Sequence, residues 1–102
     1  MSAYDYLNPE LLQRIDEIAR EALGELSDEQ KAMVADMTGS DLIGAHFGIG
    51  VWIRNRFSLW SSKYRNYWPS PHPDEMSSMI LTRMRELLRE QSAADQLELM
   101  NE

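Results

Sequence analysis

Residues 42–56 read LIGAHFGIGVWIRNR, and this stretch decides the predicted fold. When it is placed on a helix of 100° per residue, apolar residues occur on nearly every side. A helix that is apolar all round is typically buried in the middle of a domain. The stretch therefore predicts a central buried helix over residues 42–56. One side of it would carry Leu42, His46, Ile49 and Ile53, and the other side Gly44, Gly48, Val51 and Trp52.

The glycines of this stretch have two interpretations. Glycine lowers helix stability by about 1 kcal/mol relative to alanine, so its presence needs a reason. Gly44 and Gly48 are four residues apart, and a helix side without side chains lets another backbone approach closely. We expect such close packing at Gly48. The alternative is that Gly48-Ile49-Gly50 breaks the helix beside a ligand.

Helix signals also precede the central stretch. Asn8 is a suitable N-cap and Pro9 a suitable first residue for a helix that Gly24 would end. Ser27 and Gln30 have the spacing of a capping box, which predicts the start of a short second helix.

The second half of the chain predicts one irregular connection and one long helix. Residues 58–72 are rich in proline and aromatic residues, and proline excludes regular helix there. Pro73 can open the last helix, with acids in its first turn. Residues 92–102 either extend this helix weakly or are loose. The sequence thus predicts an all-α fold, a small bundle of four or five helices, in a single domain over residues 1–102.

The charge of the chain is unevenly distributed. Residues 1–41 hold ten acids and three bases, residues 42–73 four bases and no acid, and residues 74–102 seven acids and three bases, for a net charge of −7. The overall acidity argues against general nucleic-acid binding. The basic centre still allows one anion-binding patch.

The composition also indicates a compartment. The chain has no cysteine, which excludes disulfides and thiolate sites and suits a reducing cytoplasm. Its first residues show no signal-peptide pattern, and no apolar run approaches the roughly 18 residues of a membrane span. We expect a cytoplasmic protein without membrane contact.

Five polar residues are candidates for a binding site. His46 would be either a buried, hydrogen-bonded histidine or a general base or ligand. Arg54, followed by Asn55, would pair with an acid or bind an anion. His72 and Asp74 would form a turn and helix cap or act as acid–base groups. Because no acid lies between Asp41 and Asp74, we hypothesise an Arg54–Asp74 pair, direct or through an anion, with a histidine beside it.

The aromatic residues supply the sixth candidate. Seven of the nine fall between Phe47 and Trp68, interleaved with arginine and lysine. Such a segment could stack nucleic-acid bases, but it is also typical of core and rim residues and of protein-binding surfaces. Trp60 is the aromatic that we include in the candidate binding set.

The sequence does not contain the residue patterns that several enzyme activities require. The two histidines have neither HxxxH nor HExxH spacing, so we expect no metal site. There is no GxSxG nucleophile motif and no phosphate-binding GxxxxGK[ST] loop. We therefore name no catalytic residue and no cofactor, and an enzyme is the less favoured class.

Two sequence blocks, HFGIGVWIRN with a following LW and HPDEMSSMIL, resemble a family of small uncharacterised bacterial domains of unknown function. The resemblance covers about residues 42–82. It departs from the family pattern at Ile49, Glu75 and Phe57-Ser58. The resemblance implies no activity, cofactor or catalytic residue. The matching residues are His46, Phe47, Gly48, Gly50, Trp52, Ile53, Arg54, Asn55, Leu59, Trp60, His72, Pro73, Asp74, Met76, Ser77 and Ile80.

Three functions compete at this point. The first is a small helical protein-interaction or regulatory module, such as an accessory or inhibitor protein of a phage or mobile element, whose partner is another protein. The second is a binder of a small anionic ligand such as a nucleotide. The third is a small hydrolase that uses His46, His72 and Asp74. For this function the sequence shows neither a complete nucleophile arrangement nor a complete set of metal ligands. The sequence gives no oligomeric state.

Overall fold

The computed structural model describes residues 9–45, 48–59 and 72–100. These residues form five helices and, within those ranges, no strand. The predicted all-α class with four or five helices is confirmed. The helices are α1 (Pro9–Gly24), α2 (Asp28–Ala35), α3 (Gly39–Gly44), α4 (Ile49–Arg56) and α5 (Pro73–Met100).

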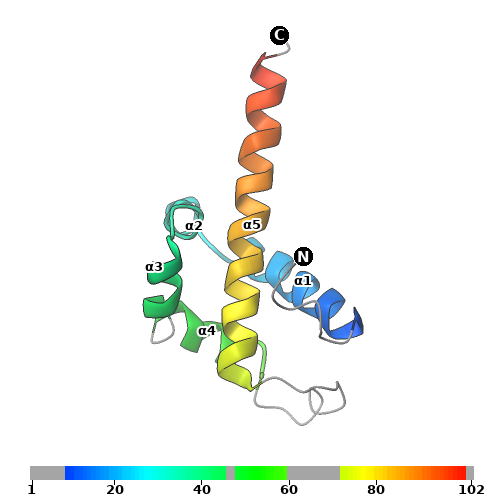
Figure 1. The fold of residues 1–102 in the computed structure, drawn as a ribbon, viewed down its shortest axis with the longest axis vertical. Coiled ribbons are helices and arrows are strands. Elements are labelled where there is room, and N and C mark those ends of the chain that lie inside the picture. Colours follow the sequence, from blue (N-terminus) through cyan, green and yellow to red (C-terminus); the bar gives the residue numbers. More distant parts are fainter. Residues whose placement is uncertain (1–8, 46–47, 60–71, 101–102) are drawn as a thin grey trace.

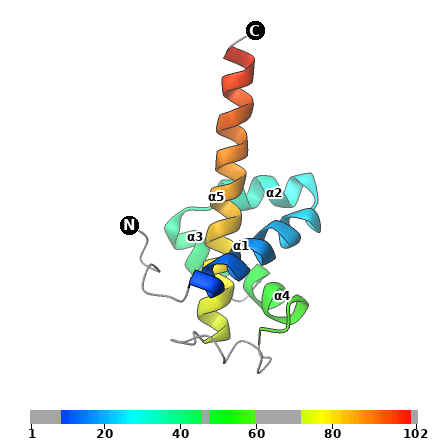
Figure 2. The ribbon, with the colours of Figure 1, turned by 90° about the vertical axis from the view of Figure 1, so that its right-hand side faces the viewer.

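Helix α5 is the axis of the molecule. The other four helices all contact it, and they surround its first part in the two views of Figures 1 and 2. Its last part projects from this helical body as a single helix. The central element is therefore α5 and not the predicted helix over residues 42–56.

The predicted central helix is two helices, α3 and α4. Helix α3 ends at Gly44 and α4 begins after Gly48, whose backbone is not helical, with φ −110° and ψ −101°. The Gly48 amide donates to the carbonyl of Ala45, at 3.0 Å. Glycine has the weakest helix propensity after proline, so a stretch with three of them is where a helix ends most readily. Of the two interpretations of the glycines, the helix break describes the backbone.

The first two helices follow their local signals. Helix α1 begins at Pro9 and ends at Gly24, as predicted, while Asn8 lies outside the described residues. The predicted capping box of α2 is present: Ser27 Oγ accepts from the Gln30 amide at 3.1 Å, and Gln30 Oε1 accepts from the Ser27 amide at 2.8 Å. These contacts satisfy two amides that the first turn of a helix leaves without partners.

The core forms where α1 and α4 pack on α5. The described buried apolar side chains come mainly from these three helices, and burial of each of the larger ones contributes roughly 1.5–3 kcal/mol. They are Leu11, Ile15, Ile18, Ala19 and Ala22 of α1; Ile53 of α4 with Phe57 and Leu59 after it; Met76, Met79, Ile80, Leu81 and Met84 of α5; and Val34 of α2.

Charged side chains connect the helices around this core. Arg83 of α5 donates to Asp16 of α1 at 2.7 Å. Arg89 of α5 donates to the carbonyls of Ala35 and Met37 at 3.0 and 3.1 Å. Because carbonyls at the end of a helix lack intrahelical partners, this arginine satisfies the end of α2 and fixes it to α5.

The projecting part of α5 comprises residues 89–100, which are helical and all exposed. Of the two predicted possibilities for the residues after 91, continuation of the helix is the one observed up to Met100. None of the helices in the described ranges has the length and apolar character needed to cross a membrane.

Candidate functional site

Arg54 is the centre of a polar cluster between α4 and α5. Its side chain is buried, with an exposed fraction of 6%. Its Nη1 donates to Ser77 Oγ at 2.9 Å, and its Nε lies 3.4 Å from Asp74 Oδ1. The predicted Arg54–Asp74 pair is therefore present as a direct contact.

The first turn of α5 supplies the rest of the cluster. Ser77 Oγ donates to the carbonyl of Asp74 at 2.9 Å, so the hydroxyl is bonded on both sides. The Asp74 amide donates to His72 Nδ1 at 3.1 Å, and this nitrogen lies 3.6 Å from Asp74 Oδ2. A ring nitrogen that accepts carries no proton.

The structure brings together three of the six candidate residues: Arg54, His72 and Asp74. Asn55 is exposed on α4, and within the described residues its side chain forms no hydrogen bond with the cluster. His46 and Trp60 lie outside the described residues, so the roles that we predicted for them stay predictions.

The candidate residues predicted from the sequence did not include two members of the cluster, Ser77 and Gly50. A Cβ on Gly50 would lie 3.3 Å from Arg54 Nη1 and 3.2 Å from the Ala45 carbonyl oxygen. Gly50 thus leaves the space that the guanidinium occupies. The spacing of four residues between Gly50 and Arg54 was the available signal, because residues i and i+4 are neighbours on a helix.

The close packing that we predicted at Gly48 is wrong. Gly48 is exposed, and a Cβ there would meet its nearest atom, the Ala45 carbonyl oxygen, at 3.9 Å, an ordinary contact distance. At Gly44 a Cβ would meet no atom of the described residues within 4 Å. Gly50 is the glycine at a tight position, because it lies on the side of α4 that faces the core.

This geometry favours a structural use of the cluster. Ser77 has an exposed fraction of 1%, and both of its hydrogen bonds are internal, so it presents no nucleophile to a substrate. An anion at Arg54 would have to replace the Asp74 carboxylate. Within the described ranges, no three His, Cys, Asp or Glu side chains gather in a way that could hold a metal ion.

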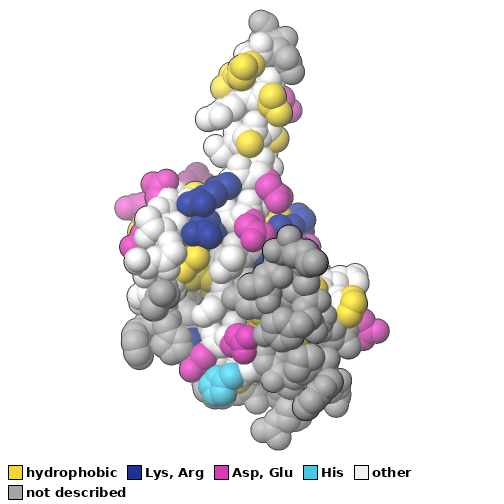
Figure 3. All heavy atoms as spheres, in the orientation of Figure 1, with side chains coloured by type: hydrophobic (Ala, Val, Ile, Leu, Met, Phe, Trp, Pro, Cys, Tyr) yellow, Lys and Arg dark blue, Asp and Glu magenta, His cyan; other side chains and the backbone are white. Residues whose placement is uncertain are grey.

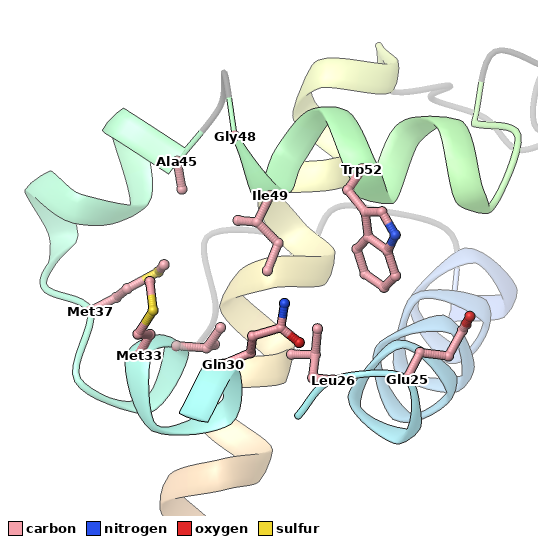
Figure 4. A pocket seen from close by; sticks show the side chains of 10 residues that line it. Glu25, Leu26, Gln30, Met33, Met37, Ala45, Gly48, Ile49 and Trp52 are labelled. Atoms are coloured by element: carbon pink, nitrogen blue, oxygen red, sulfur yellow. The ribbon is translucent and has the colours of Figure 1, made fainter. Parts of the chain in front are cut away.

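A second feature, which the sequence did not indicate, is an apolar pocket between α2 and α4. Its volume is about 510 Å³. Ile49 and Trp52 extend into it from α4 toward Leu26, and Met33 and Met37 form its other end (Figure 4). Its lining residues are Glu25, Leu26, Gln30, Met33, Val34, Met37, Ala45, Gly48, Ile49 and Trp52.

Aromatic and charged contacts hold the α4 wall of this pocket. The Trp52 and Phe57 rings pack edge to face, with centroids 6.2 Å apart. Arg56 lies over the Phe57 ring at 5.0 Å and donates to Glu25 at 2.9 Å. These contacts connect the α4 wall to Glu25, directly after the end of α1.

Comparison with curated proteins and with solved structures finds no match for this chain. A family model described as Domain of unknown function (DUF6794) matches residues 12–88. The match is longer than the resemblance over residues 42–82, since it includes most of α1 and all of α2. The matched range ends at residue 88, where α5 leaves the helical body. The chain belongs to the DUF6794 family of domains of unknown function.

Proposed function

We propose that this chain is a protein-interaction module whose partner inserts apolar side chains into the pocket between α2 and α4. The observation that carries the proposal is the pocket itself. It has a volume of about 510 Å³, its walls include Ile, Trp and Met side chains, and Met33 at its edge has an exposed fraction of 62%. An apolar surface of this kind on a small domain is typical of a binding site.

The chemistry of the walls favours a protein segment as the partner. Tryptophan and methionine are enriched at protein interfaces, and the flexible thioethers of Met33 and Met37 can adapt to the shape of an inserted side chain. The acids Asp28 and Glu29 are exposed on the adjacent first turn of α2. We therefore expect an amphipathic helix with apolar anchors and flanking lysine or arginine.

The biological role that we attach to this binding is regulatory. An accessory or inhibitor protein of a phage or mobile element would need a compact domain with such a contact surface. The support for this part is the small size and the net charge of −7, which fit that class.

The test compares partner capture by the parent chain and by two charged variants. Met33→Asp places a carboxylate at the edge of the pocket, and its exposure means that the fold should tolerate it. Leu99→Asp is the matched control, since it adds the same charge to an apolar side chain of similar exposure, 72%, on the projecting part of α5. A partner captured by the parent and by Leu99→Asp, and lost with Met33→Asp, supports the proposal.

Methionine-methyl NMR then locates the binding. We expect the methyl signals of Met33 and Met37 to move on addition of the captured partner, and those of the core residues Met76 and Met84 to move little. A partner that Met33→Asp still captures, or that leaves the Met33 and Met37 signals in place, contradicts the proposal. A melting temperature raised by a nucleotide instead would favour the anionic-ligand alternative.

A further inference from the structure

A groove lies where α5 leaves the helical body. It has a volume of about 580 Å³ and runs between α5 and the region where α1 ends and α2 passes. Its apolar lining is Leu23, Leu87, Leu88 and Ala94, and its charged lining is Arg20, Lys31 and Glu90. Arg20 also donates to Asp16 at 2.8 Å. The space-filling view shows basic and acidic side chains around the point where α5 leaves the body, and hydrophobic ones along the projecting helix (Figure 3).

The projecting part of α5 exposes apolar side chains of its own. Leu97 has an exposed fraction of 60%, and Leu99 and Met100 are still more exposed. Residues 89–100 continue a helix that already exists in the body, so they can stay helical without a new nucleation step. Their apolar side chains remain in water, however, and burying them against another surface would be favourable. The described residues of their own chain do not provide that surface.

The helix continues the apolar floor of the groove. Leu87, Ala94 and Leu97 are spaced by seven and three residues, so they fall along one side of α5. Leu87 and Ala94 line the groove, and Leu97 lies beyond it. One side of α5 thus forms part of the groove and, farther along the helix, carries Leu97, an apolar side chain that could fill such a groove.

The projecting helix and the groove differ in charge. After Arg89 the sequence has four acids, Glu90, Asp95, Glu98 and Glu102, and no base. The side of the groove formed by α1 and α2 has Arg20 and Lys31, and the side formed by α5 has Glu90. The acidic helix is therefore complementary to the α1 and α2 side of the groove, whereas the pocket between α2 and α4, close to Asp28 and Glu29, would repel it.

We propose that the occupant of the groove is the projecting helix of a second copy of this chain, in a symmetric dimer. Two antiparallel α5 helices that cross between Leu87 and Leu97 place Leu97 of each copy beside Leu87 of the other. These two residues are about 15 Å apart along one helix, at 1.5 Å per residue. Each copy then fills the groove of the other, as a two-fold interface requires.

Sedimentation equilibrium of the full chain tests the dimer. The parent should dimerise, and Leu97→Glu should raise the dissociation constant about tenfold or more, since it places a charge in the apolar contact. Leu99→Glu is the matched control: Leu99 is exposed and lies about 200° around the helix from Leu97, so its dissociation constant should stay within about twofold of the parent. Circular dichroism verifies that both variants are folded.

Charge reversal tests the assigned groove. Lys31→Glu should weaken the dimer, and adding Glu98→Lys to the same chain should restore it, because the symmetric arrangement pairs these positions between copies. A parent chain that stays monomeric up to about 1 mM overturns the proposal. The proposal is also overturned if Leu97→Glu and Leu99→Glu weaken the dimer equally. The same holds if the Lys31→Glu, Glu98→Lys variant does not regain the dimer affinity of the parent.

Discussion

At the scale of single residues, Gly50 decides whether Arg54 can lie in the core. A Cβ at Gly50 would be 3.2 Å from the Ala45 carbonyl oxygen and 3.3 Å from Arg54 Nη1, both tighter than ordinary contacts. We expect Gly50→Ala to lower the free energy of unfolding by roughly 1–3 kcal/mol, measured by urea denaturation. Gly44→Ala is the control: a Cβ there would meet no atom of the described part of the chain within 4 Å, so the change should be neutral or stabilising by up to about 1 kcal/mol. If Gly50→Ala unfolds like the parent, the guanidinium does not need this space.

The hydroxyl of Ser77 gives a second prediction at this scale. It accepts from a buried guanidinium, so Ser77→Ala leaves that donor without this acceptor and should cost about 1–3 kcal/mol of unfolding free energy. A double-mutant cycle with Arg54→Met checks the mechanism. In the Arg54→Met background the Ser77→Ala loss should shrink by about 0.5–3 kcal/mol, since contacting residues couple. Equal losses in both backgrounds would mean that the two side chains act separately.

The Arg54–Asp74 contact could be anticipated from the sequence because of an imbalance of charge. No acid lies between Asp41 and Asp74, and a buried arginine needs a negative or hydrogen-bonding partner. Ser77 could not be singled out in the same way. Its role depends on where the guanidinium lies relative to α5, which is set by tertiary packing and not by a local pattern. For Gly50 the sequence offered only the spacing of four residues to Arg54.

At the scale of elements, α1 and α5 are joined by an ion pair that should respond to pH. The pKa of the Asp16 carboxyl is lowered below its usual 3.8 by the hydrogen bond from Arg20 and then by that from Arg83, against a rise caused by partial burial. A lowered pKa in the folded state stabilises the fold above pH 3.8, and this stabilisation is lost as pH falls through the lower folded value. We expect Asp16→Asn to be less stable than the parent at pH 7 and the difference to shrink below about pH 4, measured by urea denaturation at several pH values. A difference independent of pH would show that the carboxylate charge is not responsible.

The helices differ in how well their ends could be predicted from the sequence. The ends of α1, α2 and α5 follow proline and capping signals that act within one turn, so local reasoning placed them. Residues 42–56 were interpreted as one helix because apolar residues occur on every side. That pattern also fits two short helices that pack at different angles, and only their contacts with α5 distinguish the two cases. The pocket was missed for a related reason: its walls come from elements far apart in the chain.

At the scale of the whole molecule, α5 has two parts of different stability. Ile80 and Leu81 are buried among the other helices, whereas residues 89–100 are exposed along their whole length. We expect the amide hydrogens of residues 92–100 to exchange fast in dilute solution, those of Ile80 and Leu81 to exchange slowly, and the protection of residues 92–100 to rise with protein concentration. Hydrogen exchange followed by NMR measures this. Uniform slow exchange along α5 in dilute solution would contradict it.

The axial position of α5 also has a consequence for the order of events during synthesis. The four helices that pack on α5 all precede it in the chain, and the ion pair between Asp16 and Arg83 joins residues that are 67 positions apart. A ribosome delivers these four helices first, while the surface against which they bury their apolar sides is still inside the exit tunnel. Folding of the body must therefore wait for residues 73–88. In the meantime the ten acids of residues 1–41, against three bases, help to keep the first helices apart from other chains.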